Sequence, residues 1–154
     1  MVASHVEQAV QKILKEDGYS YPQNLAMACA WMMGNFKAEG LKVIEIGAKS
    51  SLTDFFVIGT AQNSTQLSAM ASETKRVLKS MGHVSLSEEG TSESGWVLID
   101  YGDIMAHIFL PAAREMYDLE SLWREAPRKE IPQDYYTSTP HVLETSSGSA
   151  GDYF

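Results

Sequence analysis

Several features that define whole classes of protein are missing from this chain of 154 residues. Its single cysteine, Cys29, cannot form an internal disulfide, and no Cys-His pattern surrounds it to suggest a catalytic thiol. No apolar run approaches the roughly 20 residues that a membrane span needs. Residues 1–14 interrupt their apolar positions with His5, Glu7 and Lys12, unlike the core of a signal peptide. We therefore expect a cytoplasmic protein without membrane association, whose one thiol is buried and structural.

Basic residues are also scarce. Lys and Arg total 12 against 20 Asp and Glu, which gives a formal net charge of −8 at pH 7. Proteins that grip a phosphate backbone are normally basic, because Lys and Arg displace its counterions. The composition therefore predicts no direct dependence on nucleic acid. An acidic chain suits a basic protein partner, but acidity also serves solubility, so charge alone leaves both interpretations open.

Common motifs of nucleotide binding and catalysis are absent as well, namely G-x-x-x-x-G-K-[ST], G-x-G-x-x-G and G-x-S-x-G. The densest polar cluster is formed by Asp100, Gly102, Asp103 and His107, and two carboxylates near a histidine could hold a metal ion. Asp100, however, lies across a turn from the other two ligands. We favour Asp103 as a turn residue and His107 as a hydrogen-bonded sheet residue. We expect no catalytic residue, metal ion or cofactor.

The chain does contain clear helical and strand patterns. Apolar spacing predicts helices over residues 3–17, 24–37 and 63–81, and strands over 43–46 and 55–60. The expected helix ends are Asn24 and Asn63 as N-terminal caps, the latter in a capping box with Gln66, and Gly40 and Gly82 as stops. Further along we expect a weak strand at 83–86, a polar loop at 87–95, a hairpin of strands 96–101 and 104–110 around Gly102-Asp103, and a last helix from Pro111 to Trp123.

These elements suggest three parts. Residues 1–22 form an N-terminal helical extension, residues 23–124 the main domain, and residues 125–154 a tail. The tail is rich in Pro, Ser, Thr and Gly and cannot bury enough apolar surface to offset its ordering entropy, so we expect it to be disordered. The order of elements in the domain, α-β-β-α-β-β-β-α, predicts an α/β fold: a mixed β-sheet with packed helices.

Bulky residues typical of interfaces concentrate near the end of the domain. Trp96 begins a strand beside the acidic loop. The last predicted helix packs bulky residues into barely three turns, namely Arg114, Tyr117, Leu119, Glu120, Leu122 and Trp123. Tyr, Trp and Arg dominate the residues that contribute most to protein–protein binding. For any single aromatic residue a place in the core is favoured, because aromatic side chains bury large areas. For the whole set an interaction surface is at least as well supported.

The order of these segments resembles the ribosomal silencing factor (Iojap) family. The first half of the resemblance is carried by Glu45-Ile46, the run Ser51 to Ile58, and residues 60–66. The second half is carried by Glu89-Gly90, residues 96–103, His107 and residues 114–123. The resemblance covers about residues 25 to 123 and preserves order and spacing. Its departures are conservative: Glu45, Ala61 and Asn63 stand where the family usually has Asp, Gly and Ser.

The resemblance implies a nucleotidyltransferase-like fold without enzymatic activity. It also implies a homodimer that binds the large ribosomal subunit through that subunit's ribosomal protein fourteen. Bound there, the protein would sterically block association with the small subunit and repress translation. By position, the residues expected to face the ribosome are Trp96, Asp100, Tyr101, Gly102, Asp103, Arg114 and Tyr117.

Two other functions remain to be weighed. An active nucleotidyltransferase would need a Gly-Ser loop and an Asp-x-Asp pair that holds two metal ions. Here Gly59 is followed by Thr60, and Asp100 and Asp103 are three residues apart, so the sequence argues against such an enzyme. A dimeric adaptor with another protein partner stays open.

Overall fold

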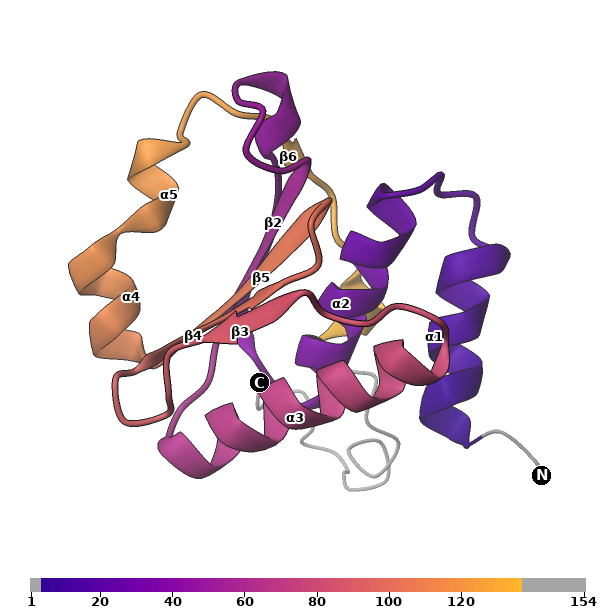
Figure 1. Cartoon of the computed structure of the whole chain (residues 1–154), viewed down its shortest axis with the longest axis horizontal. Helices are drawn as coiled ribbons and strands as arrows, with labels where there is room; N and C mark the ends of the chain where they lie inside the picture. Colours follow the sequence, from indigo (N-terminus) through magenta and orange to yellow (C-terminus); the bar gives the residue numbers. More distant parts are fainter. Residues whose placement is uncertain (1–3, 137–154) are drawn as a thin grey trace.

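The computed structural model describes residues 4–136, which form a mixed six-stranded sheet with helices on both faces (Figure 1). The sheet order is β3-β4-β5-β2-β1-β6. β2 and β5 are parallel, and every other neighbouring pair is antiparallel. The strands are β1 (Glu39–Glu45), β2 (Phe55–Thr60), β3 (Ser87–Glu89), β4 (Trp96–Asp100), β5 (Ile104–Phe109) and β6 (Arg128–Lys129). The predicted α/β class with a mixed sheet is confirmed.

The helices divide between the two faces of the sheet (Figure 1). One face packs against α2 (Gln23–Asn35) and α3 (Ser64–Ser80), and α1 (His5–Lys15) packs on these two helices. The other face packs against α4 (Pro111–Tyr117) and α5 (Leu119–Leu122). Strand alternation explains this division. In β5, Ile104, Ala106 and Ile108 belong to the first core, while Met105, His107 and Phe109 face the second.

Helix α2 lies at the centre of the first core. All residues from Leu25 to Gly34 are buried, and a helix that is apolar all round must be covered on every side. The sheet covers one side, and α1 and α3 cover others, so Val10 and Ile13 of α1 share this core. Cys29 lies here, where burial raises the pKa of its thiol to about 12. The predicted structural thiol is therefore confirmed. Within residues 4–136 no helix has the length and apolar character required to span a bilayer.

The predicted helix ends are partly correct. Asn63 caps α3 as expected, since its Oδ1 accepts a hydrogen bond from the backbone N–H of Gln66 at 2.8 Å. The side chain of Gln66 accepts from the N–H of Gln62 instead of completing a capping box. The prediction that Asn24 caps α2 is wrong, because Asn24 lies inside the helix and its side chain donates to the carbonyl of Leu14. The prediction that Gly40 ends this helix is also wrong, because Gly40 lies in β1.

The strand predicted at residues 83–86 is wrong, and a strand forms instead at 87–89, inside the predicted polar loop. These three residues are all exposed and pair with Leu98 to Asp100 at the edge of the sheet. An edge strand with both faces open carries no apolar alternation, so only the pairing with β4 reveals it. The single last helix is also wrong: Asp118 adopts φ 46° and separates α4 from α5.

The start of the predicted tail is ordered. Arg128–Lys129 forms β6 against Val43 and Ile44 of β1. A short 3₁₀ turn, η2 (Gln133–Tyr135), then buries Tyr135 to 4% exposure. The prediction of disorder is therefore wrong for residues 125–136, and residues 137–154 lie outside the described part. The division into extension, domain and tail otherwise remains a prediction.

Gly34 shows how closely the ordered end of the chain lies against α2. A Cβ at this position would stand 2.1 Å from the carbonyl oxygen of Tyr135. We expect Gly34→Ala to destabilise the protein by about 1–3 kcal/mol, because the backbone of η2 must move away. Urea denaturation of the full chain measures this loss.

A matched background tests the cause. In a chain that ends at Pro132 the contact is gone, and alanine is the better helix former by roughly 1 kcal/mol. There, Gly34→Ala should be neutral or stabilising. An equal loss in both backgrounds would show that the contact with Tyr135 is not responsible.

Candidate functional site

The sheet face beneath α4 and α5 carries a second, smaller apolar core. Its buried members come from β1 and the turn that follows it, from β2 and β5, from α4, and from the segment before β6: Ile44, Ile46, Phe56, Ile58, Phe109, Ala113 and Ala126. Around them lie side chains that are only partly buried, namely Trp96, Met105, Leu119 and Trp123. The two short helices therefore cover this face incompletely.

Trp96 lies at the border of this core. Its indole stacks on Phe109, with ring centroids 5.0 Å apart, and tilts against Tyr117 at 4.7 Å. The indole Nε1–H donates a hydrogen bond to Nδ1 of His107 at 3.2 Å. The ring is therefore held on three sides and only partly buried. Two of the predicted site residues, Trp96 and Tyr117, are brought into direct contact.

His107 is almost fully enclosed, with 3% of its surface exposed. Its ring meets Phe56 edge-on at 4.4 Å and lies nearly parallel to Phe109 at 6.3 Å. The prediction of a hydrogen-bonded sheet residue is confirmed by the contact with Trp96. Burial lowers the pKa of His107 to about 3, because the charged imidazolium would lose its hydration. The ring is therefore neutral at physiological pH.

Arg114 points inward. Its guanidinium donates to both carboxylate oxygens of Glu120, to Thr60 Oγ1 at 2.8 Å, and to the carbonyl of Gly40 at 2.8 Å. The left-handed turn at Asp118 brings Glu120 back toward it. The hydrogen bonds from Arg114 lower the pKa of Glu120. Arg114 thus braces α4 and α5 against β1 and β2, with only 15% of its side chain exposed.

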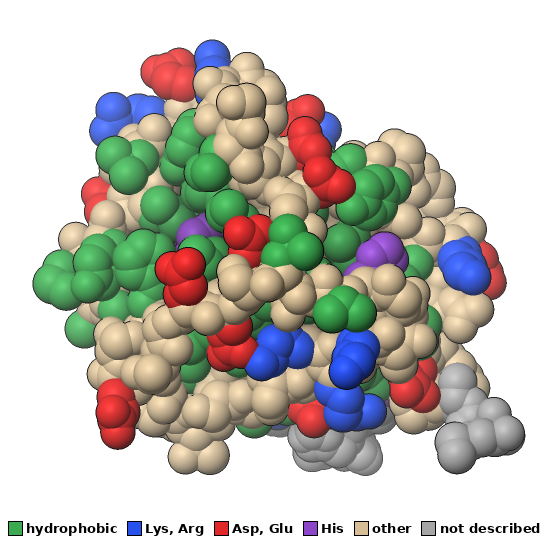
Figure 2. All heavy atoms as spheres, in the orientation of Figure 1, with side chains coloured by type: hydrophobic (Ala, Val, Ile, Leu, Met, Phe, Trp, Pro, Cys, Tyr) green, Lys and Arg blue, Asp and Glu red, His purple; other side chains and the backbone are tan. Residues whose placement is uncertain are grey.

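Outside this brace, large apolar side chains are open to solvent. Met116 is 70% exposed, Leu122 74% and Tyr117 48%. Figure 2 shows hydrophobic side chains gathered over α4 and α5. We call Trp96, Met116, Tyr117 and Leu122 the α4–α5 surface. A contiguous exposed apolar area of this kind marks a site of protein interaction.

Leu122 was among the bulky residues of the predicted interaction surface, but neither it nor Met116 was among the residues expected to face the ribosome. A single helix over 111–123 offers one apolar face, and nothing in that pattern separates its core residues from exposed ones. The break at Asp118 changes which side chains point outward. The sequence did contain one signal of exposed apolar residues: this segment holds more bulky apolar side chains than three helical turns can bury.

The predicted hairpin residues lie elsewhere and build the turn itself. Asp100 Oδ1 accepts from the N–H of Gly102 at 2.7 Å, and Asp103 Oδ2 accepts from the hydroxyl of Tyr21 at 2.7 Å. Tyr101 is 8% exposed and belongs to the first core. Trp96 stands at the other end of β4, four residues or about 13 Å away. The structure therefore does not bring the hairpin and Trp96 together.

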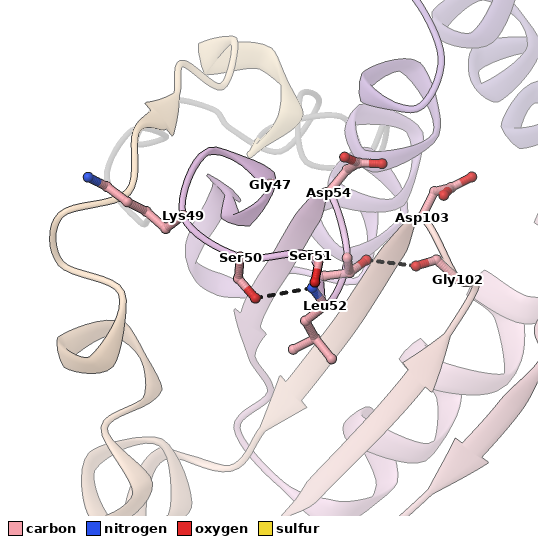
Figure 3. A pocket seen from close by; sticks show the side chains of 9 residues that line it. Gly47, Lys49, Ser50, Ser51, Leu52, Asp54, Gly102 and Asp103 are labelled. Atoms are coloured by element: carbon pink, nitrogen blue, oxygen red, sulfur yellow. Dashed lines mark hydrogen bonds between the residues drawn. The ribbon is translucent and has the colours of Figure 1, made fainter.

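A shallow hollow of about 540 Å³ lies beside the hairpin, between it and the loop of residues 47–54 (Figure 3). The carboxylates of Asp54 and Asp103 extend on the same side, and Lys49 points away. Ser50 accepts from the N–H of Leu52, and Thr53 donates to the carbonyl of Gly102, so the loop is tied at two points. Among the residues described, no group of three or more His, Cys, Asp or Glu could hold a metal ion.

A second group of exposed apolar residues surrounds the tip of the hairpin. Tyr21 is 53% exposed and bonds to Asp103, and Leu86 is 72% exposed and lies against Gly102. Leu52, which lines the hollow with Gly102 and Asp103, is 54% exposed, and Val84, two residues before Leu86 in the chain, is 62% exposed. We call Tyr21, Leu52, Val84 and Leu86 the hairpin patch. It is separate from the α4–α5 surface.

Comparison with known proteins identifies one family. The family profile described as "Ribosomal silencing factor during starvation" matches residues 20–151. A protein named ribosomal silencing factor RsfS from Halalkalibacterium halodurans is 37% identical over 95 residues, 62% of this chain and 81% of that protein. One of the same name from Zymomonas mobilis is 35% identical over 112 residues, 72% of this chain and 84% of that protein.

A solved structure has a similar fold. The crystal structure of a protein from Chromobacterium violaceum superimposes with a TM-score of 0.65 and 26% identity. The match covers 74% of this chain and 92% of that one. The arrangement of sheet and helices is thus shared with that protein.

The buried histidine predicts a specific pH dependence. Because the pKa of His107 falls from 6.5 to about 3 on folding, the unfolded chain takes up a proton first as the pH is lowered. The contribution of a neutral His107 to stability is therefore complete above pH 6.5 and is lost between 6.5 and 3, at about 1.4 kcal/mol per pH unit.

We expect the wild-type protein to lose about 2 kcal/mol more than His107→Phe between pH 7 and pH 5. The phenylalanine ring fills the site but does not titrate. Urea denaturation of both proteins at each pH measures the difference, and identical pH profiles would contradict it.

Proposed function

The chain belongs to the family of ribosomal silencing factors, and from that premise we propose that it binds the large ribosomal subunit and sterically blocks association with the small one. The proposed result is repression of translation by a cytoplasmic protein that acts without catalysis. The structural observation that supports the proposal is the α4–α5 surface, where Met116 and Leu122 are 70% and 74% exposed on helices braced from below.

The surface has the character of a docking site. Interfaces combine an apolar centre with a polar rim, and here the exposed Glu115 and Asp118 flank Met116 and Tyr117 along the chain. Ribosomal proteins are generally basic because they bind RNA phosphates. The net charge of −8 favours encounter with such a partner. Our proposed contact is ribosomal protein fourteen of the large subunit, with no direct dependence on RNA.

The hydrogen-bond network explains how so small a surface can be selective. Arg114 holds both short helices to the sheet through Glu120 and Thr60. The backbone of both helices is therefore fixed before binding, and only the rotamers of the exposed side chains remain to be ordered. Of the predicted ribosome-facing residues, Trp96 and Tyr117 remain in this proposal as contacts, and Arg114 supports them. Asp100, Tyr101, Gly102 and Asp103 shape the hairpin patch instead.

We also propose that the protein is a homodimer and that the hairpin patch forms the seam. Tyr21, Val84 and Leu86 offer apolar area that a two-fold related copy could cover. A lasting seam must bury upward of about 1,000 Å² in total, so neighbouring residues would join it. Because the patch is separate from the α4–α5 surface, the dimer could bind the ribosome without dissociating.

An active nucleotidyltransferase is the alternative that the hollow beside the hairpin raises, since Asp54 and Asp103 both line it. Magnesium-dependent binding of a nucleoside triphosphate, measured by calorimetry, would support that alternative. A dimeric adaptor for another protein predicts neither nucleotide binding nor co-sedimentation with ribosomal subunits.

Two matched double variants test the docking surface. We expect wild-type protein to co-sediment with isolated large subunits and to reduce subunit joining in light-scattering measurements. Met116→Ala/Leu122→Ala should weaken binding by on the order of 2 kcal/mol, about thirtyfold, because exposed apolar side chains at an interface centre are lost. Thermal unfolding should change little, since both side chains are more than two thirds exposed.

Val84→Ala/Leu86→Ala is the control, because these residues are similarly exposed, at 62% and 72%, but belong to the hairpin patch. It should bind large subunits like the wild type. Equal weakening by both pairs would contradict the placement of the surface. Failure of saturating wild-type protein to affect joining would contradict the proposed function.

The same two double variants test the homodimer, with their roles as test and control exchanged. In analytical ultracentrifugation across a dilution series, Val84→Ala/Leu86→Ala should shift the equilibrium toward monomer, and Met116→Ala/Leu122→Ala should not. The expected cause is the loss of apolar area at the seam. A wild-type protein that stays at monomer mass at high micromolar concentration would rule out the homodimer.

A further inference from the structure

The hydrogen bond between Trp96 and His107 determines which edge of the indole faces outward. In the register of the hairpin, Trp96 pairs with Phe109 and Leu98 pairs with His107. Trp96 and His107 are therefore diagonal neighbours on the same face of the sheet. The indole Nε1–H reaches Nδ1 of His107 at 3.2 Å, so the polar edge of the indole is turned inward.

This bond also settles where the histidine carries its proton. A neutral imidazole has one acceptor and one donor nitrogen. Because Nδ1 accepts from Trp96, the proton of His107 must be on Nε2. Nε2 is buried and has no hydrogen-bond partner among the described residues. A buried donor without a partner costs about 1–3 kcal/mol.

Stability alone does not account for a histidine here. The ring packs between Phe56 and Phe109, where a phenylalanine of similar shape would make the same contacts without an unpaired N–H. What phenylalanine cannot supply is an acceptor for the indole. Within residues 4–136, the group that donates to this acceptor is Trp96, a member of the α4–α5 surface.

We propose that His107 is a positioning residue that holds the N–H of Trp96 inward, so that the docking partner meets the carbon edge of the indole. This inference rests on the proposed function and names the chemistry of the contact. The partner must present aliphatic or aromatic carbon to Trp96 and needs no hydrogen-bond acceptor there. A partner that offered an unpaired acceptor at this point would be disfavoured, because that group would be desolvated without a donor.

The hydrogen bond between Trp96 and His107 persists throughout the physiological pH range. Since burial keeps the pKa of His107 at about 3, the ring does not become charged in the physiological range. Nδ1 therefore remains an acceptor, and the orientation of the indole does not depend on pH.

Two substitutions separate the acceptor from the ring. His107→Phe keeps a ring packed against Phe56 and Phe109 but removes the acceptor. His107→Asn loses the ring but can place its Oδ1 near the position of Nδ1 and so keeps the acceptor. We expect His107→Phe to be at least as stable as the wild type and to bind large subunits about tenfold more weakly, or about 1.4 kcal/mol.

His107→Asn should show the opposite. It leaves space in a packed core and should unfold at lower denaturant concentration. Its affinity for large subunits should stay within about threefold of the wild type, because the acceptor keeps the orientation of the indole. If His107 had only a structural role, affinity would follow stability in both variants, and that result would overturn the inference.

The orientation itself has a spectroscopic signature. In a proton–nitrogen correlation spectrum, the indole N–H signal of Trp96, assigned with Trp96→Phe, should be protected from exchange with solvent. In His107→Phe this signal should shift and exchange faster, while those of Trp31 and Trp123 stay unchanged. An unprotected Trp96 signal in the wild-type protein would also overturn the inference.

The outcomes distinguish the two proposals. If wild-type protein does not bind large subunits, the proposed function fails, and the inference about its contact fails with it. If the wild type binds and His107→Phe binds equally well, only the inference fails. If binding separates from stability as described, both are supported.

Discussion

Parallel pairing of β2 with β5 is the contact on which both faces of this protein depend. It aligns Ile58 with His107 and Thr60 with Phe109. One set of alternate residues is thereby directed toward α2, and the other set toward α4 and α5. A shift of one residue would exchange the two sets. His107 would then face away from Phe56, its aromatic neighbour on β2.

On the second face of the sheet, hydrogen bonds fix the short helices α4 and α5 to the strands, while apolar side chains of these helices are exposed to solvent. Arg114 ties the short helices to the strands through hydrogen bonds with Glu120, Thr60 and the backbone. His107 fixes the indole of Trp96 from beneath. Both are enclosed polar groups that act through neighbouring side chains. The backbone of a surface held in this way has little conformational entropy to lose on binding.

Particular residues show how far the sequence could predict this structure. The apolar run at 55–60 and the turn at Gly102-Asp103 predicted β2 and the β4–β5 hairpin, because burial and turn geometry are written in local residue types. Strand β3 and strand β6 were not predicted. Both are short edge strands whose backbone pairing to β4 and β1 needs no apolar pattern of its own.

The sequence by itself determined the class of fold, the family, and the aromatic residues from which a binding surface could be built. Only the tertiary structure decided which of them share a site. Trp96 and Tyr117 meet because the β4–β5 register places Trp96 opposite Phe109, just before α4 begins, whereas the hairpin residues lie at the far end of the same strand. Local patterns report burial and turns within a few residues. Contact between distant segments depends on register and on helix breaks, which those patterns do not contain.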